Sequence, residues 1–161
     1  MSSRIRLGSR HDIEGCVDLW TRLIAQRDGL NVVGEVAGRA RSAFEQPIVR
    51  FAVIGCAPIG FALTITRRQG IALLSRICVD PSVASRGHGA GLVIDAVEHS
   101  YKAGMKRVDL DVRETNTRAT ALYTRMVFVA ISEPWRYDNG DRLVTYSYDL
   151  TMHKEVSSYG H

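Results

Sequence analysis

One segment of the chain runs from an apolar strand pattern into a cluster of glycines: Leu74-Ser75-Arg76-Ile77-Cys78-Val79-Asp80-Pro81, then after four residues Arg86-Gly87-His88-Gly89-Ala90-Gly91. The apolar residues predict a β-strand over 71–79 that ends at Asp80-Pro81. Beyond the glycines, apolar residues recur at helical spacing and predict a helix over 91–103. This strand–loop–helix order is typical of a phosphate-binding site, because glycines let backbone N–H groups approach an anion and a helix N-terminus presents unpaired donors.

The glycine loop fits neither of two familiar nucleotide-binding motifs. A P-loop closes with Gly-Lys-Ser or Gly-Lys-Thr, whereas this loop closes with Gly91-Leu92-Val93. A dinucleotide-binding fingerprint needs a glycine at its last position, where this segment has Leu92. Taken alone, the glycines are equally compatible with the start of a helix that binds no ligand.

Outward from this segment, the hydrophobic pattern alternates between strands and helices. It predicts strands at 5–7, 48–56, 59–68, 71–79, 107–112, 128–135 and 142–150, and helices at 11–27, 35–45, 91–103 and 119–126. Ser9 and Asp12 resemble a capping box, and Asn139-Gly140 is a strong hairpin-turn signal. The order β-α-α-β-β-β-α-β-α-β-β predicts an α+β fold with a mixed sheet.

Length and composition narrow the class of protein. With 161 residues, the chain is expected to form a single domain over 1–150, followed by a loose polar tail over 151–161. Its apolar runs are far shorter than the ~18 residues of a membrane span, so no membrane is expected as a partner. Three widely spaced cysteines form neither a disulfide framework nor a metal pair, which favours a cytoplasmic location. The net charge of +4 is spread along the chain, so we expect no nucleic acid as a partner, and a nucleic-acid-binding module is a distant alternative.

Two linked motifs resemble those of the GNAT superfamily of N-acetyltransferases, which use acetyl-coenzyme A (acetyl-CoA). The first is the glycine segment quoted above. The second follows the pattern N-x-x-A-x-x-L-Y, here Asn116 to Tyr123, and then Val127-Phe128 stands where the family has Gly-Phe. The resemblance covers Ile5 to Leu150 and is specific between about Leu73 and Phe128. It implies a mostly antiparallel central sheet, splayed between the fourth and fifth strands and flanked by helices.

The resemblance also implies a set of cofactor-binding residues. In the family, the backbone of this loop holds the coenzyme A pyrophosphate; its residues here are Arg86, Gly87, His88, Gly89, Ala90 and Gly91. Main-chain groups of Ile77 and Val79 would bind pantetheine, and an N–H near Cys78 or Val79 would polarise the thioester carbonyl. Asn116 either contacts the cofactor or caps the following helix. The histidines have no metal-ligand spacing, so no metal is expected.

Tyr123 is the candidate catalytic residue. In the family, a tyrosine at this position protonates the departing thiolate, a role that a phenol with a pKa near 10 can perform at neutral pH. The alternative is a tyrosine that only packs in the core. The strand before the loop has no carboxylate, so the general base stays open among Asp111, Glu114, Glu133 and a water chain. Since a β-branched residue resists the left-handed conformation that ends this helix in the family, Val127 predicts a different helix end.

The acceptor site is expected beside the first two helices and the last hairpin. Candidates there are Trp20, Trp135 and Tyr137, with Arg22, Arg27 and Arg136 nearby. Aromatic and arginine side chains suit a small-molecule amine acceptor that carries a carboxylate or phosphinate beside its amine. The expected function is therefore direct acetyl transfer to a primary amine. A peptide N-terminus as acceptor, or an acyl-CoA-binding sensor without turnover, stays an alternative. A homodimer paired through edge strands within 128–150 is also expected.

Overall fold

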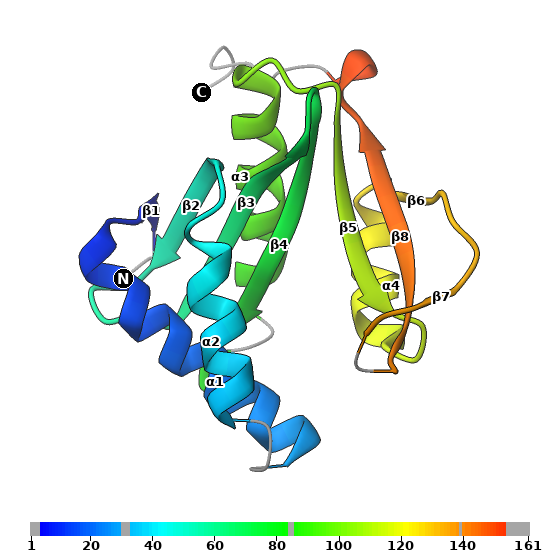
Figure 1. The fold of residues 1–161 in the computed structure, drawn as a ribbon. Coiled ribbons are helices and arrows are strands. Elements are labelled where there is room, and N and C mark those ends of the chain that lie inside the picture. Colours follow the sequence, from blue (N-terminus) through cyan, green and yellow to red (C-terminus); the bar gives the residue numbers. More distant parts are fainter. Residues whose placement is uncertain (1–3, 30–32, 84–85, 139, 154–161) are drawn as a thin grey trace.

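The computed structural model describes residues 4–29, 33–83, 86–138 and 140–153. Its strands are β1 (Ile5–Leu7), β2 (Ile48–Ile54), β3 (Gly60–Arg68), β4 (Ile71–Val79), β5 (Arg107–Arg113), β6 (Val129–Ala130), β7 (Trp135–Arg136) and β8 (Arg142–Asp149). Its α-helices are α1 (Ile13–Asp28), α2 (Val33–Ala43), α3 (His88–Lys102) and α4 (Thr117–Arg125). Short 3₁₀ helices occupy Arg10–Asp12, Pro81–Val83 and Leu150–Met152. One sheet runs through the molecule, with α1 and α2 on one face and α3 and α4 on the other (Figure 1).

The sheet is mixed, as the sequence predicted. Its order is β1-β2-β3-β4-β5-β8-β6, with β7 also paired to β8. Only the β4–β5 pair is parallel, and it is short: Ile71–Leu73 face Arg107–Asp109. Beyond these residues the two strands diverge, which opens a V in the middle of the sheet (Figure 1). We call the paired part the closed half of the β4–β5 gap. The open half is formed by Leu74–Val79 and Leu110–Arg113.

Two hydrophobic clusters hold the helices to the sheet. On one face, Leu92, Val93, Ala96 and Val97 of α3 are buried at helical spacing in a cluster that includes the inward residues of β5. On the other face, α1 contributes Cys16 and Leu19 to a second cluster. The two clusters lie on opposite faces of the sheet, so the open half lies between the α1–α2 layer and the α3–α4 layer.

A β-bulge changes the direction of side chains along β4. Leu63 of β3 pairs with Arg76, while its neighbour Thr64 pairs with Leu74, so Ser75 is the extra residue. Leu74 and Ile77 therefore both pack in the α3 cluster, and Arg76 turns toward α1. The bulge thus places a charged side chain on the α1 face of the open half.

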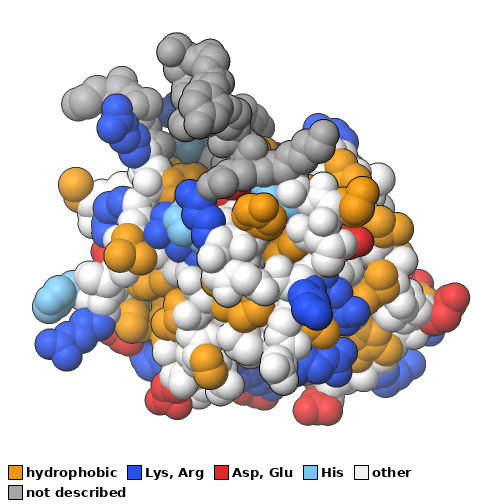
Figure 2. Space-filling model, turned by 90° about the horizontal axis from the view of Figure 1, so that it is seen from above, with side chains coloured by type: hydrophobic (Ala, Val, Ile, Leu, Met, Phe, Trp, Pro, Cys, Tyr) orange, Lys and Arg blue, Asp and Glu red, His pale blue; other side chains and the backbone are white. Residues whose placement is uncertain are grey.

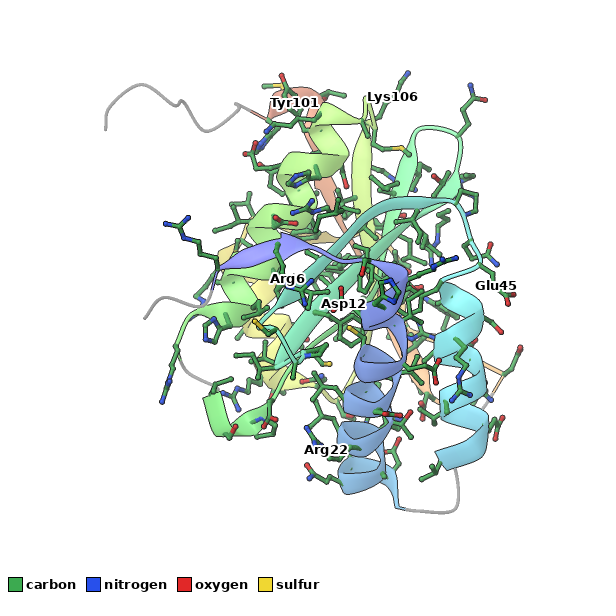
Figure 3. The ribbon with its side chains drawn as sticks, turned by 90° about the vertical axis from the view of Figure 1, so that its left-hand side faces the viewer. Arg6, Asp12, Arg22, Glu45, Tyr101 and Lys106 are labelled. Carbon is green, nitrogen blue, oxygen red and sulfur yellow. The ribbon has the colours of Figure 1, made fainter. Side chains whose placement is uncertain are left out.

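An ion pair fastens β1 to the start of α1. Arg6 donates to both carboxylate oxygens of Asp12, at 2.9 and 2.8 Å, and to the carbonyl of Gly55 at 2.8 Å (Figure 3). The predicted capping box is present, since the Ser9 N–H donates to Asp12 at 2.8 Å. This bonding lowers the pKa of Asp12 well below its usual value, with the Arg6 hydrogen bond as the main cause.

Some predicted boundaries are wrong. The helix after the glycines begins at His88 and not at Gly91, so the loop residues form its first turn. The predicted strand over 128–135 is replaced by two-residue strands on either side of Ser132, because Ser132 bends away and its hydroxyl accepts from the Thr145 N–H at 3.0 Å. Asn139 lies outside the described residues, although Gly140 beside it has a positive φ of 90°.

The chain stays packed beyond residue 150. A 3₁₀ helix spans Leu150–Met152, and His153 bonds to Tyr148 at 2.8 Å and Glu98 at 2.7 Å. His153, expected in the loose tail, therefore packs against α3 and β8, whereas Thr151 and Met152 are exposed. The rest of that tail, 154–161, lies outside the described residues.

Candidate active site

The open half offers backbone groups that no neighbouring strand uses. Between described residues, no rung joins β4 to β5 beyond Leu73 and Asp109. Ile77, Cys78 and Val79 lie in this stretch of β4, close to the strand end from which the chain continues toward α3. A strand without a neighbour on one side can pair with an extended amide-bearing ligand.

The start of α3 has the features of an anion site. Gly87 stands at the N-cap with φ of 81°, a left-handed conformation that favours glycine. Among the described residues no side chain caps the first turn, and the turn contains no acidic residue. Arg86 is exposed at the edge of the loop, and His88, Gly89, Ala90 and Gly91 are half-buried in the first turn. The donors of this turn are therefore available to a phosphate group.

The glycines leave room for a ligand to approach the backbone. A Cβ on Gly89 would meet only the Leu122 side chain, at 3.8 Å, and one on Gly87 would meet nothing within 4 Å. A Cβ on Gly91 would lie 3.4 Å from Ile5. Space over the loop, donors without a side-chain cap among the described residues, and a strand that is unpaired on its β5 side together fit the pyrophosphate and pantetheine of an acyl-CoA.

Tyr123 lies on the buried face of α4. It is 6% exposed and packs against Phe128, with ring centroids 5.9 Å apart. Burial raises the pKa of Tyr123 to about 12, so the phenol stays protonated at neutral pH. Its hydroxyl makes no hydrogen bond to any described residue, which leaves the proton available for donation.

The end of α4 corrects the prediction made from Val127. The helix does end in the left-handed conformation: Val127 has φ of 69° and is the one non-glycine residue with positive φ in the described chain. The Phe128 N–H donates to Tyr123 at 3.0 Å, and the Val127 N–H donates to Thr124 at 3.1 Å, as in a Schellman motif. Tyr123 is thus held as it would be with glycine, at the expense of backbone strain in Val127.

Two further residues are placed by their contacts. The Asn116 side chain accepts from the Ala119 N–H at 3.1 Å, so Asn116 does cap α4. A role of Asn116 toward the cofactor stays a prediction. Cys78 is packed against the α1 cluster, and burial raises the pKa of its thiol. A thiol of this kind is a poor nucleophile, which disfavours an acetyl-cysteine intermediate.

The aromatic acceptor candidates fall into two groups. Trp20 of α1 contacts Phe61 edge-to-face at 6.4 Å, and its ring lies 5.3 Å from the guanidinium carbon of Arg76. Trp135 contacts Tyr137 edge-to-face at 6.2 Å, and Tyr137 is 41% exposed. Burial lowers the pKa of Arg76, and the charge of Tyr137 raises it by less. Arg76, which we did not predict as a site residue, contacts the first group through the Trp20 ring.

The predicted arginines are less available. Arg22 donates to Asp80 at 3.0 Å, and Arg27 donates to Asp28 at 3.0 Å. Arg136 is exposed on β7. Arg22 and Arg27 are already paired with carboxylates of the chain, and Arg136 faces solvent, so each is expected to bind an acceptor carboxylate only weakly.

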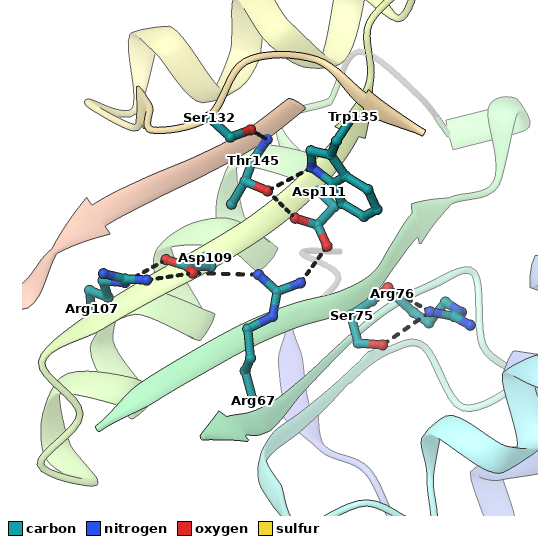
Figure 4. Close-up of polar contacts among 9 residues, drawn as sticks. All are labelled: Arg67, Ser75, Arg76, Arg107, Asp109, Asp111, Ser132, Trp135 and Thr145. Atoms are coloured by element: carbon teal, nitrogen blue, oxygen red, sulfur yellow. Dashed lines mark hydrogen bonds and ion pairs between the residues drawn. The ribbon is translucent and has the colours of Figure 1, made fainter. Parts of the chain in front are cut away.

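The β5 side of the gap carries a saturated polar network (Figure 4). Arg67 of β3 reaches Asp109 at 3.5 Å and also pairs with Asp111. Asp109 further bonds to Arg107 at 3.0 Å and Ser147 at 2.7 Å. Asp111 accepts from Thr145 at 2.7 Å, and Thr145 in turn accepts from the Trp135 indole at 3.1 Å.

This network bears on the base candidates. Asp111 is already held by a cation and a hydroxyl, and Glu114 pairs with Arg142 at 2.9 Å. Glu133 is exposed between β6 and β7. A water chain therefore stays the alternative to a carboxylate base.

Comparison with known proteins identifies the family. The model of the acetyltransferase (GNAT) family matches residues 19–128, which include both motifs, the splay and Tyr123. The chain belongs to the GNAT family of acetyltransferases. Acetyl-CoA-dependent acetylation is the activity of this family, and the fold predicted from the motifs is confirmed.

Solved structures share the fold of this GNAT domain at low sequence identity. The ribosomal-protein-S18-alanine N-acetyltransferase of Escherichia coli has a TM-score of 0.75 at 19% identity, covering 98% of this chain and 100% of that one. A putative acetyltransferase of Salmonella typhimurium, solved with acetyl-CoA, has a TM-score of 0.73 at 12% identity, covering 98% and 99%. An N-acetyltransferase of Thermoplasma acidophilum, solved with coenzyme A, has a TM-score of 0.69 at 19% identity, covering 92% and 100%. No curated protein sequence matches the chain significantly.

Other features of the GNAT domain lie away from the open half. A cavity of about 790 Å³ is lined by Gly70, Lys106 and Val127 among others, beside the closed half. No group of His, Cys, Asp or Glu within the described ranges is arranged to hold a metal ion. Nor does any described helix combine the length and apolarity needed to cross a membrane. On the face drawn in Figure 2, basic side chains are interspersed with acidic and apolar ones.

Proposed function

We propose that this GNAT domain is an N-acetyltransferase that transfers the acetyl group of acetyl-CoA directly to the primary amine of a small, amino-acid-like acceptor. The observation that carries the proposal is the open half itself. A strand with no partner on its β5 side leads into a glycine turn that no described side chain caps, and a phenol without a hydrogen-bond partner among the described residues lies in the helical layer of the α3 face. Acetyl-CoA supplies the activated acyl group, and the residues below bind and orient it.

Groups of the chain itself can stabilise the carbonyl oxygen during attack by the amine and protonate the departing thiolate. The amine nitrogen forms a bond to the carbonyl carbon, and the carbon–sulfur bond then breaks. A main-chain N–H of Cys78 or Val79 donates to the carbonyl oxygen while it carries negative charge, a contribution worth about 10²–10³ in rate. Tyr123 donates its proton to the departing sulfur, and the proton of the attacking amine leaves through water. The buried, protonated thiol of Cys78 supports transfer without an acyl-enzyme intermediate.

Tyr123→Phe tests the proposal, because it removes one hydroxyl and keeps the ring packed on Phe128. We expect kcat to fall by about 10²–10⁴ with little change in acetyl-CoA affinity, since the donation occurs only in the transition state. Release of free thiol with a panel of amines and peptides measures it. Tyr101→Phe is the matched control, because Tyr101 lies at the far end of α3 and its loss of a hydroxyl should leave kcat unchanged.

The outcomes separate the alternatives. Turnover of the Phe variant at the parent rate would make Tyr123 a core residue only. Binding of acetyl-CoA without acetylation of any amine would favour the sensor, and acetylation of peptides alone would move the acceptor to a peptide N-terminus. The pH profile adds a check: with a pKa raised to about 12, Tyr123 should cause no loss of kcat between pH 7 and about 10.

We also propose that the protein pairs as a homodimer through the sheet edge at β6. Among the described strands, β6 pairs only with β8, and Val129 and Ile131 at this edge are 62% and 51% exposed. An apolar edge strand is a template for pairing with a second copy. Light scattering at tens of micromolar should show a dimer that Val129→Lys and Ile131→Lys together dissociate. A monomeric parent would contradict it.

A further inference from the structure

Arg76 has an unused hydrogen-bonding edge. One terminal nitrogen donates to the Ser75 carbonyl at 2.9 Å and to its hydroxyl at 3.0 Å (Figure 4). Nε is fully buried and has no hydrogen-bond partner, and the second terminal nitrogen bonds to no described residue. The free side is thus the Nε–Nη2 edge. That edge can bind a carboxylate through two parallel hydrogen bonds.

The other half-buried arginines differ from Arg76 in this respect. Each of them pairs with a carboxylate of the described chain: Arg6 with Asp12, Arg39 with Glu35, Arg50 with Asp95, Arg67 with Asp109 and Asp111, Arg107 with Asp109, and Arg113 with Asp28. Arg76 has no such partner. Burial of its side chain lowers the pKa of its guanidinium below the usual value. A largely buried cation without an anion is costly to keep, and the cost is relieved when an anion arrives.

The position of Arg76 suits an acceptor and not the cofactor. It lies in the open half of β4, two residues before Cys78, so the two Cα atoms are separated by about 7 Å at the rise of a strand. The bulge at Ser75 turns it to the α1 face, opposite the layer that holds α3 and Tyr123. The Trp20 ring lies 5.3 Å from the Arg76 guanidinium, and besides burial, which lowers the pKa of Arg76 most, Tyr137 raises it and Arg39 lowers it.

We infer that Arg76 binds the carboxylate of the acceptor through its Nε–Nη2 edge, with the acceptor amine directed toward the thioester carbonyl near Cys78. The acceptor is then an amine that carries a carboxylate close to its nitrogen, as in an amino acid. Arg76 sets specificity, and Trp20 fixes the guanidinium plane. This inference rests on the proposed function, because it assigns the second substrate of the same site.

The test compares amino acids with the amines that lack only their carboxylate. Arg76→Met keeps the apolar stem against Trp20 and removes the charge, while Arg76→Lys keeps the charge and removes the two-donor edge. For amino acids, we expect Arg76→Met to raise KM by about 10- to 100-fold, the usual contribution of a charge-assisted pair, with a smaller rise for Arg76→Lys. For the decarboxylated amines, neither variant should change KM. Arg39→Met, which removes a neighbouring arginine already paired with Glu35, is the control and should change neither.

The inference would be overturned if Arg76→Met raised KM equally for an amino acid and for its decarboxylated amine. It would also be overturned if the variant changed KM for neither. A second readout keeps this result separate from failure of the proposed function. In the presence of coenzyme A, amino acids should raise the melting temperature of the parent and not that of Arg76→Met. Should the parent bind amino acids in this way and acetylate none, the proposed function fails and the Arg76 assignment stands. Should amino acids neither bind nor react while other amines react, the assignment fails and the function stands. If aminophosphonates raised the melting temperature of the parent as much as amino acids do, the inference that Arg76 selects a carboxylate would be overturned in favour of a site for anions in general.

Discussion

The two sides of the β4–β5 gap differ in how their polar groups are satisfied. On the β5 side, Arg67 reaches across from β3 and pairs with Asp109 and Asp111, and each carboxylate has a further donor. On the β4 side, β4 has no strand partner opposite β3 beyond Leu73, and among the described residues no side chain caps the first turn of α3 and no carboxylate pairs with Arg76. Because folded proteins pair nearly all their buried polar groups, the unpaired ones gathered here indicate where a ligand binds. Arg67 and Arg76 lie nine positions apart in the chain, yet one has a structural role and the other a proposed binding role.

The largest effect is expected where the open half meets the glycine turn. Gly89→Asp places a carboxylate over the turn, with room for its Cβ at 3.8 Å from Leu122, so the fold should persist. Acetyl-CoA at 100 times its dissociation constant should stabilise the parent by about 2.7 kcal/mol, and this stabilisation should vanish in the variant. Thermal melts with and without acetyl-CoA measure it. Ala103→Asp adds the same charge at the other end of α3 and should keep the ligand effect; an unchanged shift for Gly89→Asp would remove the loop from the site.

The two arginines should respond in opposite ways to loss of charge. Arg67→Met leaves Asp109 and Asp111 without a shared cation and should lower the free energy of unfolding by roughly 2 kcal/mol. The expected loss of stability is smaller than for a buried ion pair with no other partners, because Asp109 still pairs with Arg107 and Asp111 still accepts from Thr145. Arg76→Met removes a cation that has no partner and should leave stability unchanged or higher. Urea denaturation of both variants without ligand gives the comparison, and a greater loss for Arg76→Met would refute it.

The smallest effect concerns the strained end of α4. Val127→Gly relieves a positive φ at a residue that is 70% exposed, so little packing is lost. We expect the free energy of unfolding to rise by roughly 1 kcal/mol, after allowance for the greater freedom of glycine in the unfolded chain. Val129→Gly, at a residue with similar exposure in extended backbone, should not stabilise. If Val127→Gly were no more stable than the parent, the φ of Val127 would not be a source of strain.

Sequence reasoning predicted the order of elements and the glycine turn at a helix start, because these depend on local patterns along the chain; its choice of Tyr123 as catalytic residue stays a prediction. It did not select Arg76, to which we assign a binding role, since the direction of that side chain follows from a bulge at Ser75 that only the pairing of β3 with β4 reveals. An arginine within an apolar strand was the one available signal. The end of α4 was predicted wrongly for a related reason: Phe128, anchored in the core beside Tyr123, outweighs the preference of Val127. The prediction of one strand over 128–135 was wrong because the Ser132 hydroxyl accepts from the Thr145 N–H of β8, a contact that residue propensities do not encode.

Hydrogen exchange in the presence of acetyl-CoA tests the division of the gap most directly. Amides of 86–91, and those amides of 74–79 that point away from β3, should exchange faster in the free protein and become protected when acetyl-CoA is added, because the ligand satisfies donors that the fold leaves open. Amides of 71–73, already paired with β5, should be protected in both states. Protection that appeared instead around Gly70, Lys106 and Val127, the lining of the cavity beside the closed half, would place acetyl-CoA elsewhere and contradict the account.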